Sequence, residues 1–138
     1  MAEYITLTDI ATLISNSEIT SFLDDNRDGV ADVGLFDSIV TTCSDMTDAF
    51  VSSIYTVPFT GNIPALIKTA TLYFVAESLY ARRLTPDEKN PFKKTADLFR
   101  TTLSKIGAGE LPIDASVARA FDSIVYVALY SRLNDTAL

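Results

Sequence analysis

The feature that most constrains the fold is an apolar stripe that recurs at every third or fourth position from residue 35 to residue 54. Its members are Leu35, Phe36, Ile39, Val40, Cys43, Thr47, Phe50, Val51 and Ile54. This spacing places side chains on one face of an α-helix, so the sequence predicts a long helix with one buried face. Cys43 is expected to be a buried small hydrophobe there rather than a reactive thiol. The residues expected to face solvent are Asp37, Ser44, Asp45, Asp48 and Ser52.

A second long helix is predicted after residues 57–62, where proline and glycine interrupt the helical pattern. Pro64 suits the first helical position, because the N–H that proline lacks has no partner within a helix there. Apolar residues between 63 and 80 occupy most faces of this helix, so it is expected to be the central one. Arg82 and Arg83 follow it and are expected to complement the helix dipole.

A third amphipathic helix is predicted from a further apolar stripe, Phe92, Ala96, Phe99, Leu103 and Ile106. This helix has two possible N-terminal starts, a capping-box pattern at residues 85–88 and the Asn-Pro pair at residues 90–91. Gly107 and Gly109 are expected to end this helix.

The first 23 residues predict a small helical lid. Thr8 is expected to cap a short helix, and the negative charge of Asp9 in its first turn is favourable there. Ser17 and Glu18 are expected to start another helical turn. The residues expected to point inward are Ile10, Leu13, Ile14, Ile19, Phe22 and Leu23.

Carboxylates gather around a glycine at residues 24–32, Asp-Asp-Asn-Arg-Asp-Gly-Val-Ala-Asp. Calcium loops between two helices supply oxygen ligands at positions one, three, five, seven and nine, with glycine sixth. The residues in that register are Asp24, Asn26, Asp28, Val30 through its carbonyl, and Asp32, with Gly29 sixth. Position twelve holds Leu35 instead of a bidentate glutamate, which weakens any calcium site. The alternative is an acidic turn in which Asp32 helps to start the next helix.

The composition argues against several classes of protein. The chain has 138 residues, a formal net charge of -7, no histidine and one cysteine. Its negative charge disfavours binding to nucleic acid through released counterions. Without histidine it lacks the commonest general base and zinc ligand, so an enzyme is not expected. One cysteine cannot form an internal disulfide, and no apolar stretch approaches the roughly 20 residues of a membrane span. A soluble protein of the reducing cytosol is expected.

The C-terminal residues differ in composition from the rest, so the sequence divides into a helical domain of residues 1–112 and a C-terminal arm of residues 113–138. The run 124–130 is rich in β-branched and aromatic residues, which favours an extended or strand-like arm. A helix over residues 116–133 is the alternative. Because no second strand is evident, the arm is expected to contact another chain. Tyr126, Tyr130 and Arg132 are the interface candidates, with core packing as their alternative role.

The sequence therefore predicts a mainly α fold, a small bundle of three principal helices with a short N-terminal helix and the extended arm. The order of features resembles the small Mu-like phage head-tail connector (head completion or adaptor) proteins. The resemblance covers residues 4 to 112. The segments that carry it are Tyr4-Ile5-Thr6, the loop at 23–32, the helix ending in Tyr55, Val57-Pro58-Phe59, Ile63-Pro64, residues 79–83 and residues 106–111. Residues 131–138 are also similar to the end of that family.

This resemblance implies a structural role without catalysis. Such a bundle joins a ring, commonly a dodecamer, beneath the portal after DNA packaging and extends the DNA channel toward the tail. The implied partners are the portal protein, neighbouring copies of the chain, and tail or stopper proteins, while DNA passes without specific binding and no membrane takes part. The implied location is the virion neck, assembled in the host cytoplasm. The alternative function is a calcium-responsive interaction module whose loop at Asp24 to Asp32 orders when the metal binds.

Overall fold

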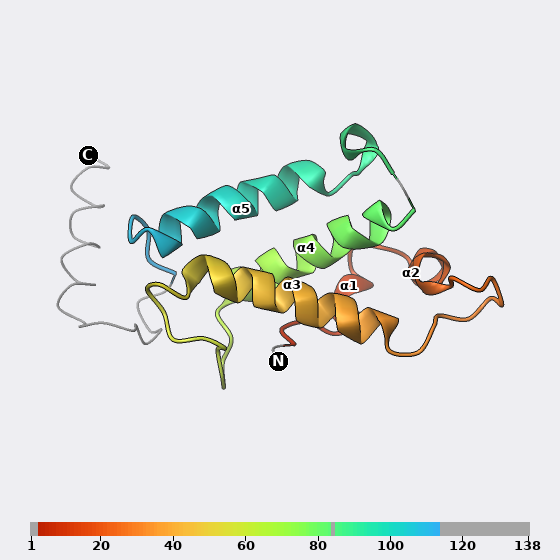
Figure 1. The fold of residues 1–138 in the computed structure, drawn as a ribbon, viewed down its shortest axis with the longest axis horizontal. Coiled ribbons are helices and arrows are strands. Elements are labelled where there is room, and N and C mark those ends of the chain that lie inside the picture. The colour runs from red at the N-terminus through yellow and green to blue at the C-terminus, as the bar shows by residue number, and fades with distance from the viewer. Residues whose placement is uncertain (1–2, 84, 114–138) are drawn as a thin grey trace.

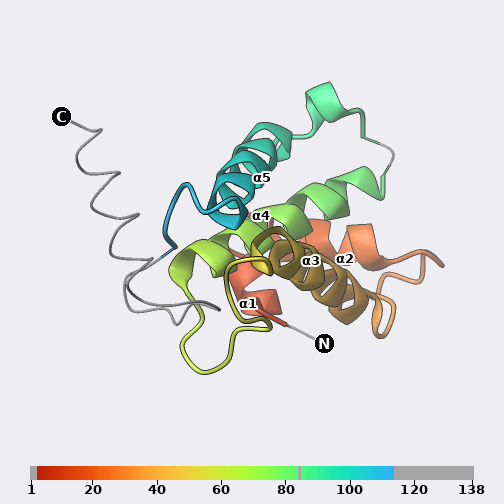
Figure 2. The ribbon, with the colours of Figure 1, turned by 60° about the vertical axis from the view of Figure 1, so that its left-hand side comes forward.

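A computed structural model describes residues 3–83 and 85–113 of the chain as a mainly helical bundle (Figure 1). In chain order its elements are α1 (Leu7–Ile10), α2 (Asn16–Leu23), α3 (Leu35–Val51), α4 (Ala65–Ala81), the 3₁₀ turn η1 (Asp87–Lys89) and α5 (Lys93–Gly107). The three long helices α3, α4 and α5 pack against one another, which confirms the predicted bundle. Figures 1 and 2 both place α4 between α5 on one side and α1 on the other.

Helix α4 is the centre of the bundle, as the sequence predicts. It packs against α1 and α2 as well as against α3 and α5. A helix that is apolar on most faces must be surrounded by neighbours, because any exposed face would leave apolar surface in water. Its fully buried side chains include Ile67, Phe74, Val75 and Leu79, each with no exposed surface. The buried stripe of α3, which includes Val40, Cys43, Thr47 and Val51, is also confirmed.

Two α3 residues expected to face solvent are instead buried. Ser44 has no exposed surface and Asp48 is 7% exposed. The extended segment before α1 lies over them, where the backbone N–H of Tyr4 donates to Ser44 Oγ at 3.2 Å. The Tyr4 hydroxyl donates to Asp48 Oδ1 at 2.6 Å and accepts the backbone N–H of Phe59 at 2.9 Å. This polar side of α3 is therefore covered by residues about 40 positions away in the sequence.

Some helix starts differ from the predicted ones. Thr6, not Thr8, caps α1, since its hydroxyl accepts the N–H of Asp9 while its own N–H donates to the Asp9 carboxylate. Pro64 is the N-cap of α4 rather than its first helical residue.

Both predicted starts of the third helix are used, but differently. Residues 87–89 form only η1, whereas the Asn-Pro pair leads into α5. The Asn90 side chain accepts the N–H of Phe92 at 3.1 Å and donates to the Glu77 carbonyl of α4, also at 3.1 Å. At the other end, Gly109 has a φ of 82°, which ends the helix as predicted.

A cluster of ionised side chains joins α5 to α4. Arg100 donates to both carboxylate oxygens of Glu77 and also pairs with Asp97 at 2.8 Å. Lys93 pairs with Asp97 at 3.1 Å. The Arg100 guanidinium also lies 5.1 Å from the centre of the Phe74 ring. These contacts fix one side of α5 and leave its outer face free.

The predicted C-terminal arm lies outside the described residues beyond Ile113, whose N–H donates to the Tyr55 hydroxyl at 3.1 Å. The choice between strand and helix for the arm, and the interface candidates Tyr126, Tyr130 and Arg132, fall in that part of the chain. Among the described residues, none of the helices has both the length and the apolar character needed to span a membrane.

Candidate functional site

The acidic loop, residues 24–32, runs from the end of α2 toward α3 and is closed on itself by its own polar groups. The N–H of Asp32 donates to the Leu23 carbonyl at 2.8 Å, and the N–H of Asp25 donates to the Asp32 carboxylate at 3.0 Å. Gly29 has a φ of 83°, a conformation that glycine adopts without steric cost. The backbone therefore curls back, and the two ends of the loop meet.

The Asp24 carboxylate organises the inside of the loop. One of its oxygens accepts the N–H of Asp28 at 3.1 Å and the other accepts the N–H of Gly29 at 2.8 Å. Partial burial alone would raise the pKa of Asp24, but these N–H groups together outweigh that effect and hold the pKa below its usual value. Asp24 is thus an ionised carboxylate at neutral pH.

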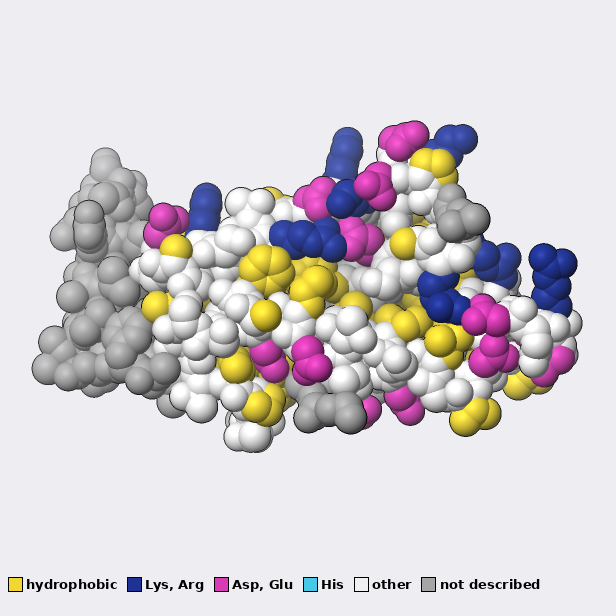
Figure 3. Space-filling view, viewed as in Figure 1, with side chains coloured by type: hydrophobic (Ala, Val, Ile, Leu, Met, Phe, Trp, Pro, Cys, Tyr) yellow, Lys and Arg dark blue, Asp and Glu magenta, His cyan; other side chains and the backbone are white. Residues whose placement is uncertain are grey.

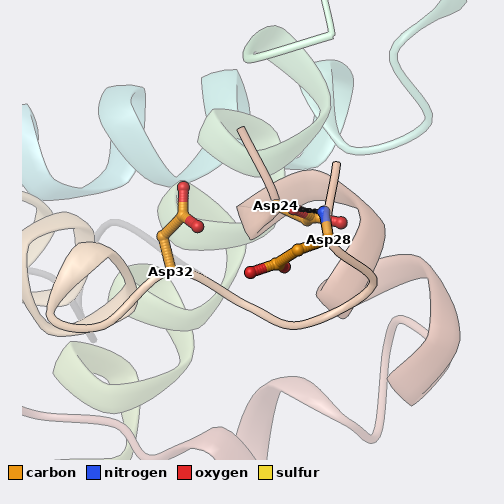
Figure 4. A group of neighbouring side chains, drawn as sticks. All are labelled: Asp24, Asp28 and Asp32. Atoms are coloured by element: carbon orange, nitrogen blue, oxygen red, sulfur yellow. Dashed lines mark hydrogen bonds between the residues drawn. The ribbon is translucent and has the colours of Figure 1, made fainter. Parts of the chain in front are cut away.

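Three carboxylates converge in this loop (Figure 4). One oxygen from each of Asp24, Asp28 and Asp32 lies within 4.8 Å of the other two. Calcium binds oxygens at about 2.3–2.6 Å, so two ligands of one ion lie at most about 5 Å apart, and these oxygens satisfy that limit. The three carboxylates predicted from the sequence are therefore brought together, and the donor set suits a hard divalent cation.

The other two predicted calcium ligands have additional roles in the loop. The Asn26 side-chain oxygen accepts the N–H of Asp28 at 3.1 Å. The Val30 N–H donates to Asp28 Oδ1 at 2.9 Å, while its side chain is 63% exposed. Leu35, at the twelfth position, is the first residue of α3 and supplies no oxygen side chain. The loop has the hydrogen bonds of a closed Asx-type turn as well as the carboxylates of a cation site.

Arg82 anchors the loop and Arg83 anchors the end of α2 beside it, and sequence reasoning missed both roles. The Arg82 guanidinium donates to both oxygens of Asp25, at 2.6 and 2.7 Å, and to the Phe22 carbonyl at 3.1 Å. Arg83 donates to the carbonyl and hydroxyl of Ser21 and lies 5.6 Å from the centre of the Phe22 ring. Both follow α4, about 60 residues away in the sequence. The Arg-Arg pair at a helix end was the available signal, but helix-dipole complementation explains that pair equally well.

Cys43 is buried in α3, 4% exposed, as predicted. Burial raises the pKa of its thiol, so the reactive thiolate is disfavoured at neutral pH. Its sulfur lies 3.6 Å from the Ser78 hydroxyl.

Comparison with known proteins gives one family. A family model described as Bacteriophage Mu, Gp36 matches residues 4–122. The match spans the acidic loop and all the helices of the described residues. The search of curated proteins found no match.

Proposed function

The chain belongs to the Bacteriophage Mu Gp36 family, and we propose that it is a structural protein of the virion, a head-to-tail connector that assembles as a ring beneath the portal. The observation that carries this proposal is the family match over residues 4–122. In this role the chain extends the DNA channel toward the tail, in the neck of a particle assembled in the host cytoplasm. Its partners are the portal protein, neighbouring copies of itself in an expected dodecamer, and tail or stopper proteins.

The negative charge of the chain supports a role next to passing DNA. The formal net charge is -7, and the loop at 24–32 carries four carboxylates against one guanidinium. Helix α3 carries two exposed acidic residues, Asp37 and Asp45, and contains no Lys or Arg. A surface of the same sign as DNA repels the phosphates, so DNA can move past it without being held. The acidic loop, which extends from one end of the bundle in Figure 1, is the segment we place toward the channel.

Heads that contain portal and packaged DNA but lack this chain provide the test of the connector role. The purified full-length chain should add a ring of density at the portal vertex in negative-stain images, and tails should then join. Unrelated acidic helical proteins of similar size serve as the control and should add nothing. Heads that never gain this ring, although their portal accepts tails in the presence of other neck proteins, would refute the proposal.

The C-terminal arm is proposed to hold the chain in the ring. A chain truncated after Pro112 should keep the far-ultraviolet circular dichroism of a helical bundle but fail to enter the particle. The triple variant Tyr126→Ala, Tyr130→Ala and Arg132→Ala should behave in the same way if these side chains make the contact. If the truncated chain unfolds, or if it still enters the particle, the arm has a different role.

A second candidate function is calcium binding by the acidic loop, which the convergence of Asp24, Asp28 and Asp32 favours. Because the twelfth position lacks a glutamate, we expect weak affinity, with a Kd of about 10⁻³–10⁻⁴ M. Titration calorimetry with calcium should give heat for the native chain, less for Asp28→Asn, and unchanged heat for Asp87→Asn, an exposed carboxylate elsewhere. Absence of heat at millimolar calcium would exclude this candidate and leave the loop as an acidic turn.

A further inference from the structure

A groove of about 620 Å³ lies between α1, α2 and the N-terminal half of α3, and it shares only Ala31 and Asp32 with the acidic loop. Its apolar lining includes Ile5, Leu7, Ile19, Leu23, Phe36 and Val40. Leu7 is 50% exposed although it is a large apolar residue. Ile5, Ile19, Leu23 and Val40 are 5% exposed or less, so the apolar surface that the groove offers to a partner is that of Leu7 and the partly buried Phe36. Burial of this surface against a partner would be stabilising.

The groove is also acidic. Glu3, Asp32 and Asp37 line it, and no Lys or Arg of the described residues does. Within residues 3–83 and 85–113, neither Glu3 nor Asp37 forms an ion pair. A partner that fits must therefore present apolar side chains flanked by basic ones.

The outer face of α5 has this chemistry. Lys94, Leu98, Thr101 and Lys105 follow one another at spacings of four, three and four residues, so they form one stripe along the helix. All four are exposed, and Leu98 is exposed by 66%. In contrast to the ion-paired Lys93 and Arg100, neither Lys94 nor Lys105 pairs with a carboxylate of the described residues. We call these four residues the α5 stripe, and it is about 16 Å long at 1.5 Å per residue.

The two surfaces lie on different sides of one molecule. In Figures 1 and 2, α5 and α1 lie on opposite sides of α4, so the stripe cannot enter the groove of its own chain. Figure 3 shows that the basic side chains on this face gather toward the upper part and are absent from the lower part. Acidic side chains without a basic neighbour lie in its lower part, where α3 runs, whereas Lys and Arg side chains occur along its upper edge, interspersed with Asp and Glu.

We propose that the α5 stripe of one copy docks into the acidic groove of the next copy, with Leu98 in the apolar lining and Lys94 and Lys105 against Glu3 and Asp37. The contact joins two different surfaces, so it is heterologous, and such contacts form a closed ring when the rotation between copies closes. This inference rests on the proposed connector function, since it names the surfaces through which neighbouring copies of the ring meet.

Charge reversal on each surface tests the contact in the full-length chain. The first variant, Glu3→Lys with Asp37→Lys, makes both surfaces basic, and the second, Lys94→Glu with Lys105→Glu, makes both acidic. Like charges at an interface repel, so each variant alone should lose at least tenfold in self-association by sedimentation velocity up to about millimolar concentration. An equal mixture of the two should associate again, because the basic groove of the first variant then meets the acidic stripe of the second, and the acidic groove of the second meets the basic stripe of the first.

The control variants carry the same change in charge at exposed residues outside both surfaces, Lys68→Glu with Lys89→Glu and Glu88→Lys with Glu110→Lys. They should associate as the native chain does, and all variants should keep the native circular dichroism. A native chain that stays monomeric, variants that still associate alone, or a mixture that stays monomeric would each overturn the proposed contact.

Incorporation into heads separates this inference from the connector function. If both reversed variants join the portal vertex as well as the native chain does, these surfaces are not the contact and the connector function stands. If the native chain never joins the vertex while the mixture still associates in solution, the contact stands and the connector function is wrong.

Discussion

Replacement of Tyr4 with phenylalanine removes one hydroxyl that joins three segments of the chain. That hydroxyl donates to Asp48 Oδ1 of α3 at 2.6 Å and accepts the Phe59 N–H, from the loop before α4, at 2.9 Å. The Tyr4 side chain is 5% exposed and Asp48 is 7% exposed, so water has little access to replace the lost contact. The variant leaves a buried carboxylate without its hydroxyl donor.

The expected cost follows from these two hydrogen bonds. A hydrogen bond to a charged group contributes about 1.5–3 kcal/mol and one between neutral groups about 0.5–1.5 kcal/mol. Because Phe59 is only partly buried and its N–H can find water, we expect the free energy of unfolding to fall by about 2–3 kcal/mol. Urea unfolding at pH 7, followed by circular dichroism, measures this difference.

A matched control separates the hydroxyl from the ring. Tyr73 packs its ring against Phe92 and Phe99, and its hydroxyl forms no hydrogen bond within the described residues. Tyr73→Phe should therefore change the free energy of unfolding by less than about 0.5 kcal/mol. A cost for Tyr4→Phe as small as that of Tyr73→Phe would refute the reasoning.

The penalty of Tyr4→Phe should also depend on pH. Burial, together with the nearby charge of Asp45, raises the pKa of Asp48, and the Tyr4 hydroxyl opposes this rise. The neutral Asp48 carboxyl therefore favours folding below the ordinary aspartate pKa of about 3.9, and that contribution is lost as the pH rises through the raised pKa. Without the hydroxyl the pKa rises further, so the penalty is largest at pH 7 and decreases toward pH 4. A penalty that does not vary between these pH values would contradict this assignment.

Two further substitutions test the packing and the anchored loop. Gly107→Ala should destabilise the protein by about 3 kcal/mol or more, because its Cβ would lie 1.9 Å from the Phe50 carbonyl oxygen of α3. Gly61→Ala, whose Cβ has no neighbour within 4 Å, should cost only about 1 kcal/mol for its positive φ. Equal melting temperatures of the two variants would contradict the close approach of Gly107 to the Phe50 carbonyl. Arg82→Ala should cost about 1 kcal/mol, since Asp25 is largely exposed and screened, and should speed hydrogen exchange in residues 24–32 more than in α5. Equal acceleration in both segments would show that Arg82 does not anchor the loop specifically.

The three long helices could be predicted from the sequence because their signal is local. Apolar residues on the buried face of a helix recur every three or four positions. The apolar stripes predicted for α3 and α5 from this spacing contain the residues that are buried in the bundle. The helix ends were less predictable, since two neighbouring threonines, Thr6 and Thr8, can each cap α1. Only Thr6 lies three residues before Asp9, the spacing that lets the two side chains cap each other's backbone.

The acidic loop was also predictable in part. Its hydrogen bonds join residues two to nine positions apart, so the register of Asp24, Asp28 and Asp32 already places them together. The contacts of the loop with Arg82 were not predictable, because they join residues 57 positions apart.

The burial of Asp48 and the groove beside α3 depend in the same way on contacts between segments distant in the sequence. A polar residue on a helix is expected to face water unless the fold brings another segment over it, and a single sequence does not show which segment does so. The same limit applies to the α5 stripe, since exposed apolar residues such as Leu98 are recognisable only once the rest of the helix is packed.

The most direct test of the connector role is a cryo-electron microscopy map of the neck in the complete particle. We predict a ring of copies of the α3–α5 bundle between the portal and the tail, with the acidic loop toward the DNA channel. A neck map in which every ring is accounted for by other proteins, with this chain absent from the particle or located elsewhere in it, would contradict the connector function.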